Sequence, residues 1–315
     1  MAKTRLFITG GSGMVGQNIK EHKLADLYEI IAPNKKELDI SDFAATKNYI
    51  IKTKPDVVIH AAGRVGGIQA NIANPVDFLI KNVDLGRNLI MAARETGIDK
   101  LINIACSCIY PRNSINPLKE NMLLEGELEP SNEGFALSKL FAIRLCDYIN
   151  RENKQAGLKI NYKTLISCNV YGRHDKFDPQ SSHLIPAIIH KLHLAKTTLP
   201  PQDVVIWGNG SARREFMYAG DLAGAILQAV EQYDQIPNLM NIGFGRDYSI
   251  NNYYESVAKV VGWHGGFVHD LTKPVGMQKK ILDINNQRVW GWAPETSLIE
   301  GIETAYKFYL NEFSK

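Results

Sequence analysis

Three glycines near the start of the chain have the spacing of a phosphate-binding turn. Gly10, Gly13 and Gly16 follow the apolar run Leu6–Ile8 and precede a stretch of helical character. Gly10 would allow a tight turn, Gly13 would let the backbone approach a pyrophosphate, and Gly16 would let helix and strand pack closely. The first N–H groups of the helix would then point at the phosphates. The pattern predicts a dinucleotide-binding turn.

Further along the chain, a lysine and two thiols carry reactive groups. Phe135 and Lys139 are four residues apart in a segment of helical pattern, so both would project from one helix face. Cys106, Ser107 and Cys108 follow an apolar run of strand type. One residue separates the two cysteines instead of the two residues of a zinc hook, and the four cysteines of the chain do not suit a disulfide framework. No metal site is predicted.

The composition is that of an ordinary soluble globular protein. A formal net charge of +3 over 315 residues does not indicate binding to nucleic acid or to a membrane surface. No apolar run is long enough to cross a bilayer, and the first residues run straight into a strand, so no signal peptide is predicted. We therefore expect a cytoplasmic protein without nucleic-acid or membrane partners.

Short apolar runs alternate with helical segments from the N-terminus onward. This alternation predicts an α/β fold, a Rossmann-type doubly wound parallel sheet whose ligands bind at the carboxyl ends of the strands. Segments 63–67 and 106–111 lie at such ends. From about Tyr171 the pattern is less regular, which indicates a smaller mixed α/β substrate-binding cap. The predicted domains are a dinucleotide-binding domain at 1–170, with returns near 213–245, and the cap at 171–212 and 246–315.

The loop after the second predicted strand bears on the choice of cofactor. An acidic residue there would bind the adenosine ribose of NAD, whereas Asn34, Lys35 and Lys36 suit the 2′-phosphate of NADP better. Two lysines in a loop are also common where they are merely solvated. We expect NADP (NADPH) as the cofactor. The expected cofactor-binding residues are Gly10, Gly13, Met14, Val15, Gly16, Asn34, Lys35, Asp39, Ile40, Ala61, Ala62 and Gly63.

In its motifs the chain resembles the extended short-chain dehydrogenase/reductases, whose Thr-Gly-x-x-Gly-x-x-Gly turn corresponds to Thr9–Gly16. Within that group it is similar to the GDP-L-fucose synthases, which are NADPH-dependent GDP-4-keto-6-deoxymannose epimerase/reductases. The likeness covers nearly the whole chain. It is carried by Gly13-Met-Val-Gly16, Arg64-Val-Gly-Gly-Ile, Cys108-Ile-Tyr-Pro, Leu128-Glu-Pro-Ser-Asn-Glu, Ser182-His-Leu-Ile-Pro, Val205-Ile-Trp-Gly-Asn-Gly, Arg214-Glu-Phe and Lys280-Ile-Leu-Asp.

Two departures from that family fall on its catalytic positions. Phe135 stands where the family has a catalytic Tyr, with Lys139 retained, and Cys106, next to Ser107, stands where it has a catalytic Ser. A Tyr whose pKa is lowered by the lysine would protonate the alkoxide left by hydride transfer, and Phe135 cannot. Four alternatives are open: an engineered change, a natural variant with another donor (Cys106, Cys108, His183 or a Lys139-held water), a loss of reduction, or a shifted alignment.

The resemblance also implies roles for the remaining candidates. Cys108 and His183 match the family's epimerisation base and acid, and Lys139 would hold the nicotinamide ribose. Arg214 and Lys280 would meet the diphosphate of a nucleotide sugar. Taken alone, each of these residues is more often an ordinary core or surface residue. Two further substrate residues are implied: Trp207, which would stack on a sugar or base, and Asn169, which would hydrogen-bond the sugar or phosphates.

The resemblance implies an enzyme, an NADP-dependent oxidoreductase that reduces C4 of a GDP-4-keto sugar, a 6-deoxyhexose or heptose, in surface-glycan precursor synthesis. Two alternatives stay open: a C3/C5 epimerase without net reduction, and a non-catalytic protein that binds NADP(H) or a nucleotide sugar. A homodimer through a helical bundle is expected from the family.

Overall fold

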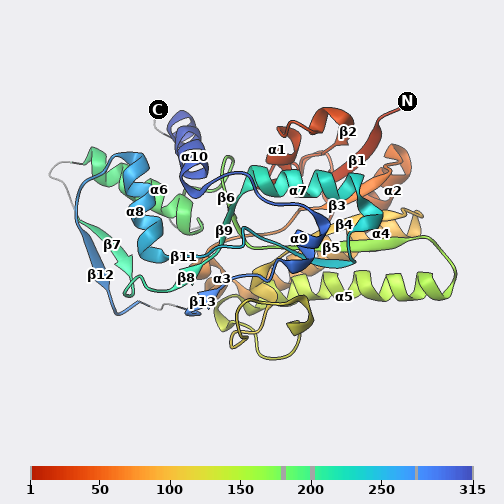
Figure 1. Cartoon of the computed structure of the whole chain (residues 1–315). Helices are drawn as coiled ribbons and strands as arrows, with labels where there is room; N and C mark the ends of the chain where they lie inside the picture. The colour runs from red at the N-terminus through yellow and green to blue at the C-terminus, as the bar shows by residue number, and fades with distance from the viewer. Residues whose placement is uncertain (1, 179–181, 199–202, 274–275, 314–315) are drawn as a thin grey trace.

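The computed structural model describes residues 2–178, 182–198, 203–273 and 276–313. Its centre is a parallel sheet of six strands in the order β2-β1-β3-β4-β5-β10 (Figure 1). This confirms the predicted Rossmann-type fold. The strands are β1 (Thr4–Thr9), β2 (Tyr28–Ile31), β3 (Val57–His60), β4 (Lys100–Cys106), β5 (Asn161–Ser167) and β10 (Leu239–Ile242).

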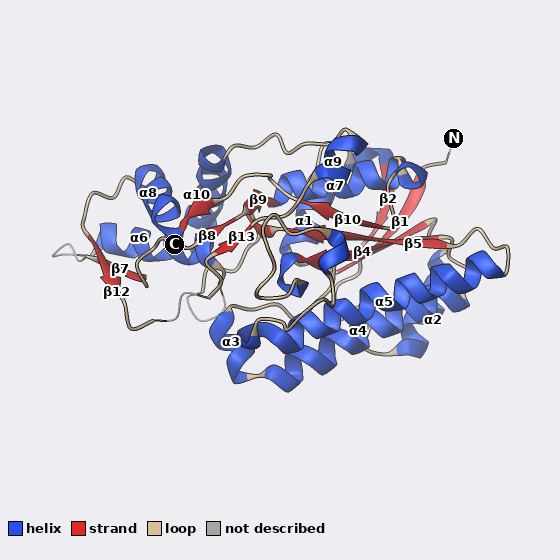
Figure 2. Ribbon diagram, turned by 60° about the horizontal axis from the view of Figure 1, so that its bottom comes forward, coloured by secondary structure: helices blue, strands red, loops and turns tan. Residues whose placement is uncertain are grey.

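Helices cover both faces of the sheet, because the central strands are apolar on both sides. Leu6 and Ile8 pack into one core with residues of α7, whereas Phe7 faces the other core with residues of α4 and α5. Figure 2 shows α2, α4 and α5 on one side of the sheet and α7 on the other. These helices are α1 (Met14–Lys20), α2 (Phe43–Thr53), α4 (Pro75–Glu95), α5 (Glu133–Gln155) and α7 (Ala219–Glu231).

The strand order reverses direction between β1 and β3. The chain leaves β1 for β2 on one side and then returns to β3 on the other. In open α/β sheets the crevice at such a switch point is where nucleotide ligands bind. The turn at 10–16 and the segment at 61–67 follow these two strands, so the fold brings both predicted cofactor segments to one crevice.

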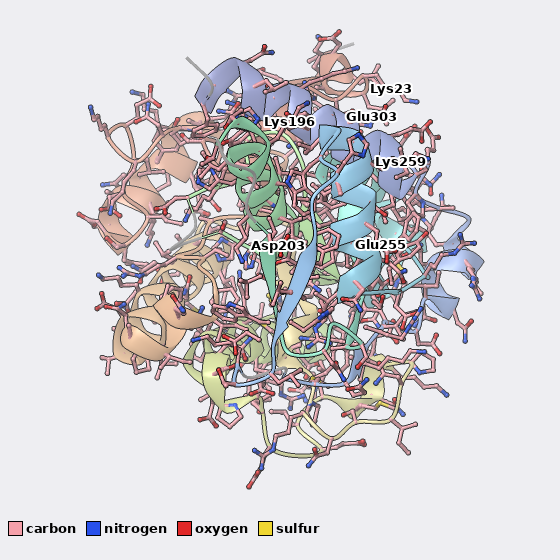
Figure 3. All side chains as sticks on the ribbon, turned by 90° about the vertical axis from the view of Figure 1, so that its left-hand side faces the viewer. Lys23, Lys196, Asp203, Glu255, Lys259 and Glu303 are labelled. Carbon is pink, nitrogen blue, oxygen red and sulfur yellow. The ribbon has the colours of Figure 1, made fainter. Side chains whose placement is uncertain are left out.

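A second core lies beside the carboxyl ends of the sheet. Lys196 Nζ donates to the carbonyl of Val261 at 2.7 Å, which joins α6 to α8, and the amide of Gly266 donates to Asp203 Oδ1 at 3.1 Å. Figure 3 views this end of the molecule, with Lys196 and Asp203 labelled. The elements of this core are α6 (Leu184–Thr197), β7 (Val204–Trp207), α8 (Ile250–Val261), β12 (Phe267–Asp270) and α10 (Leu298–Phe313).

Short strands connect this cap to the sheet (Figure 1). β11, β8 and β13 form a three-stranded sheet, and β6 pairs with β9. The domain boundaries given above stay a prediction. No helix among the described residues is both long and apolar enough to span a membrane. The remaining elements are α3 (Ile68–Ala73), β6 (Asn169–Tyr171), β8 (Arg213–Arg214), β9 (Phe216–Tyr218), β11 (Tyr248–Ser249), β13 (Lys279–Lys280), α9 (Asn285–Trp290) and the 3-10 helices at 25–27, 107–109, 120–122, 130–132 and 233–235.

Candidate active site

The glycine turn is packed too tightly for side chains at two of its three predicted glycines. Gly10 has a φ of +75°, and a Cβ built there would lie 2.9 Å from the backbone of Ala61 and Ala62. A Cβ at Gly16 would lie 2.4 Å from the carbonyl oxygen of Gly10. Gly13 is exposed at the start of α1, and no side chain caps the helix there. The exposed backbone N–H groups at this end of α1 can therefore approach a phosphate.

The far side of the crevice is held by hydrogen bonds between β1, β3 and α4. Thr9 Oγ1 lies 3.1 Å from His60 Nδ1 and accepts from the amide of Ala62 at 3.3 Å. Burial, together with the charge of Lys139, lowers the pKa of His60 to about 3, so this ring is neutral. Asn82 Oδ1 accepts from the amide of Arg64 at 2.8 Å, and its Nδ2 donates to the Arg64 carbonyl at 3.1 Å. The segment at 61–64 is thus fixed from both sides.

The loop after β2 is shaped by its own side chains. Asn34 Oδ1 accepts from the amides of Lys36 and Glu37 at 2.8 and 3.2 Å. Lys35 Nζ lies 3.5 Å from Asp39 Oδ2, and both side chains are exposed. Asp39 also accepts from Ser41, a hydrogen bond that lowers its pKa. Ile40 is buried in the core with residues of β1 and α2, and this packing anchors the loop.

Lys139 stands at the carboxyl end of β4. Its Nζ donates to the carbonyl of Ile104 at 3.1 Å and lies 5.9 Å from the centroid of the Phe135 ring. The prediction that these two side chains share one helix face is confirmed. A Cβ at Gly63 would lie 3.8 Å from Lys139 Nζ, which places the ammonium beside the crevice. Burial lowers the pKa of Lys139, while Cys106 and Cys108 act in the opposite direction.

Cys106 and Cys108 form a hydrogen-bonded pair of free thiols. Their sulfur atoms lie 2.8 Å apart, and both residues are partly exposed. The hydrogen bond from Cys108, together with Lys139 and Lys280, lowers the pKa of Cys106 to about 6 against the effect of burial. The same hydrogen bond and burial raise the pKa of Cys108 well above its ordinary value. The pair therefore holds one proton loosely and one tightly. Ser107 between them is buried.

Two cations are brought together by the register of short strands. β8 and β13 run parallel with Arg214 opposite Lys280, so both side chains emerge at the same level of the ribbon. Burial is the main cause that lowers the pKa of each. Lys280 acts on Cys106 and Cys108, while Glu129 opposes the effect of burial on both cations. This arrangement can hold a diphosphate beside the thiols.

Glu215 holds the segments around this cationic pair. Its side chain is 1% exposed and accepts from the amides of Gly245 at 2.7 Å and Leu282 at 2.8 Å. Its carbonyl accepts from Asn169 Nδ2 at 3.0 Å. Burial raises the pKa of Glu215 to about 7 despite these hydrogen bonds. Glu215 thereby joins Asn169, β8 and the chain after Lys280.

His183 and Trp207 lie on the cap. His183 precedes α6, next to Ser182, whose carbonyl approaches Gly67 in the crevice segment. Burial and Lys176 lower the pKa of His183, so the ring is neutral near pH 7. Trp207 is exposed on β7, with the ammonium groups of Lys191 and Lys273 6.0 and 5.8 Å from its ring.

Three supporting residues carry no site role in the sequence analysis. They are His60 at the end of the apolar strand β3, Asn82 on the amphipathic helix α4, and Glu215 between β8 and β9, and all three are buried. The sequence offers a signal only for His60, a polar residue that ends an apolar run. Their partners lie far along the chain, so the contacts could not be inferred from it.

Comparison with known proteins adds the family. Residues 6–243 match the NAD dependent epimerase/dehydratase family. The chain belongs to this family. Within the part of the chain that the structure describes, no group of three or more His, Cys, Asp or Glu side chains could hold a metal ion.

Relatives of this epimerase/dehydratase include sugar-nucleotide enzymes. It is 46% identical over 308 residues to a GDP-L-colitose synthase of Yersinia pseudotuberculosis, covering 98% of each chain. It is 47% identical over 306 residues to a GDP-L-fucose synthase of Azorhizobium caulinodans, covering 97% of this chain and 96% of the relative. The solved GDP-mannoheptose C4 reductase from Campylobacter jejuni, with NADP bound, matches with a TM-score of 0.85 and 28% identity, covering 98% and 99% of the two chains. The resemblance inferred from the motifs is confirmed.

Proposed function

We propose that the protein is an NADPH-dependent C4 reductase of a GDP-4-keto sugar, a 6-deoxyhexose or a heptose. One observation carries the proposal: Lys139 borders the glycine-turn crevice at Gly63 and also acts on both thiols, and Lys280, paired with Arg214, acts on the same thiols. A hydride carrier in the crevice and a diphosphate on the cations would thus meet at one place. The GDP-sugar names of the relatives support the substrate class.

The crevice suits a dinucleotide such as NADP(H). Because Gly10 and Gly16 have no Cβ, the turn can lie close to the sheet. Gly13 lies exposed at the rim of the crevice. Lys35 and Lys36 extend from the next loop, where a 2′-phosphate would lie. The bound cofactor would supply the hydride. Lys139 would hold its ribose, since the ammonium borders the crevice at Gly63.

Arg214 and Lys280 would bind the diphosphate of the substrate. Arg presents a planar fork that can donate to two phosphate oxygens, whereas Lys acts as a point charge. Both cations are partly desolvated, so an anion beside them is attracted more strongly than it would be at the open surface. Asn169 borders this site on the side of β9, and we propose that it contacts the sugar or phosphates. Trp207 would line the outer end of the sugar-nucleotide site.

Because Phe135 has no hydroxyl, another group must supply the proton of the reaction. Its ring packs edge-on against Phe78 with centroids 6.3 Å apart and carries no dissociable proton. Losing a general acid typically lowers the rate ~10²–10⁴-fold, so a working reductase requires a donor other than residue 135.

We further propose a cytoplasmic homodimer that works in surface-glycan precursor synthesis. Neighbouring helices α4 and α5 expose apolar side chains, among them Val76, Ile80, Phe141 and Tyr148, at 71, 51, 38 and 51%. An apolar face on two neighbouring helices suits a bundle with a second copy of the chain.

The first experiment follows NADPH absorbance with a panel of GDP-4-keto sugars, with NADH in parallel. Oxidation by the chain as it stands would support the reductase, and the sugar turned over fastest would identify the substrate. A Phe135→Tyr variant run beside it separates an inactive site from a wrong substrate. Silence from both, with deuterium entering the sugar from heavy water, would contradict the reductase.

That last outcome would favour a C3/C5 epimerase without net reduction. The specific observation behind this second candidate is that Cys108 and His183 are both kept, whereas the hydroxyl at position 135 is absent. An α-proton beside a ketone is acidic, and a thiolate can remove it; because the pair holds the Cys108 proton tightly, this candidate requires Cys108 to lose that proton when the substrate binds. Retention of NADPH and GDP-sugar binding with neither reaction would instead mark a non-catalytic binding protein.

A further inference from the structure

Phe135 and Cys106 depart from the family pattern at two places that meet at one side chain. Lys139 lies against the Phe135 ring and also acts on the Cys106 thiol. The side chain that lacks a proton donor and a thiol that is more acidic than usual are thus both neighbours of Lys139. Resting on the reductase proposed above, we propose that Cys106 is the proton donor to the C4 oxygen of the sugar.

Other proton-bearing groups around Lys139 are less suited to this role. His60 is buried, engaged with Thr9 and neutral. Ser107 is buried. Lys139 itself donates to the Ile104 carbonyl. Cys106 also neighbours Lys139, and unlike His60 and Ser107 it is partly exposed. It is the last residue of β4.

The second thiol makes Cys106 acidic. Once Cys106 loses its proton, Cys108 at 2.8 Å donates a hydrogen bond to the thiolate. Lys139 from α5 and Lys280 from β13 supply positive charge, and Arg214 and Glu129 in turn act on Lys280. Cys108 keeps its own proton tightly for the same reason. The pair therefore delivers one proton and not two.

The step balances in electrons and protons. The hydride supplied by NADPH adds to C4 of the sugar, and the carbonyl π pair moves onto the oxygen. The S–H bond of Cys106 breaks, its proton forms the O–H bond, and the electron pair stays on sulfur. The sugar is reduced, the nicotinamide is oxidised, and the thiolate regains a proton from solvent before the next turnover.

A donor with a pKa near 6 is protonated in only a small fraction of molecules at neutral pH. Because the pKa of Cys106 lies below that of an ordinary thiol, kcat/KM should fall about tenfold per pH unit once the pH exceeds that pKa. A Tyr at position 135 would move this fall to higher pH. The pH profile thus reports the identity of the donor.

The test compares the wild type with Cys106→Ser, Cys108→Ser, Phe135→Tyr and the Cys106→Ser/Phe135→Tyr double variant. Ser keeps the shape of Cys106 with an oxygen in place of the sulfur but holds its proton too tightly, so kcat should fall ~10²–10⁴-fold. The double variant should recover activity, which shows that the loss is not a folding defect. Cys146→Ser, at a buried cysteine on α5, is the matched control and should keep the wild-type kcat.

A second readout does not depend on turnover. The rate of alkylation of Cys106 by iodoacetamide, followed by mass spectrometry against pH, should titrate near pH 6 and shift upward in Cys108→Ser. A Cys106→Ser variant with kcat within twofold of wild type would overturn the inference, as would a Cys106 thiol that titrates above pH 8. Turnover by Phe135→Tyr alone would leave the proposed reductase chemistry standing and overturn the role of Cys106. Absence of turnover by both the wild type and Phe135→Tyr would overturn the proposed function itself.

Discussion

Replacing Glu215 by Gln should make stability depend on pH in a predictable direction. The carboxyl is 1% exposed, and burial raises its pKa from an ordinary 4.5 to about 7. A carboxyl with a raised pKa binds protons more strongly in the folded chain than in the unfolded one. Its favourable contribution is complete below pH 4.5 and is lost as the pH rises to 7. The loss is on the order of 3 kcal/mol, since each pKa unit corresponds to about 1.36 kcal/mol.

Glu215→Gln removes this titration but keeps the shape of the side chain. Gln offers one acceptor oxygen, so one of the amides of Gly245 and Leu282 loses its partner, at about 1–3 kcal/mol and at every pH. The difference in unfolding free energy, wild type minus variant, should therefore be positive near pH 4.5. It should shrink by about 3 kcal/mol by pH 7.5.

Urea unfolding of both proteins from pH 4.5 to 8 measures this difference, in which the other titrating groups cancel. Glu303→Gln, an exposed change on α10, is the control for the loss of one carboxylate away from the buried site. A Glu215 difference that stays constant or widens with pH would refute the claim that this carboxyl is buried at a cost.

Three further predictions concern the cofactor and the assembly. Gly16→Ala places a methyl group 2.4 Å from a carbonyl oxygen, so it should lower the unfolding free energy by about 1–3 kcal/mol and weaken NADPH binding; fluorescence titration and thermal unfolding measure both. Lys36→Asp should weaken NADPH binding roughly tenfold and leave NADH unchanged, and equal losses for the two would refute a 2′-phosphate contact. Phe141→Asp, on the exposed face of α5, should convert a dimer to a monomer in sedimentation, and an unchanged mass would place the interface elsewhere.

Much of the fold could be predicted because its determinants are local. The apolar runs at β1, β3, β4 and β5 are bounded by glycines and polar residues, and the helix at 133–155 has a clear period. The spacing of Phe135 and Lys139 is a property of one helix, so their shared face followed from the sequence alone.

Contacts that depend on long-range register could not be predicted in this way. β8 and β13 are two residues each, too short for any periodicity, yet their pairing is what sets Arg214 opposite Lys280. Motif order suggested both residues as phosphate ligands without indicating that they are neighbours. Glu215 shows the same limit, because its partners belong to three separate segments.

Lys139 explains why the two departures from the family pattern should be considered together. By the resemblance, Phe135 lacks the hydroxyl of the family's Tyr, and Cys106 has a sulfur where the family's Ser has an oxygen. In the sequence these two changes look unrelated. In the fold the ring of one and the thiol of the other are both neighbours of a single ammonium, that of Lys139. With Phe at 135, that ammonium has no phenol beside it whose pKa it could lower, but it still favours the Cys106 thiolate. The resemblance implies Ser at this position and Tyr at 135; a thiol releases its proton far more readily than a serine hydroxyl, so Cys106 is the better substitute where residue 135 has no hydroxyl.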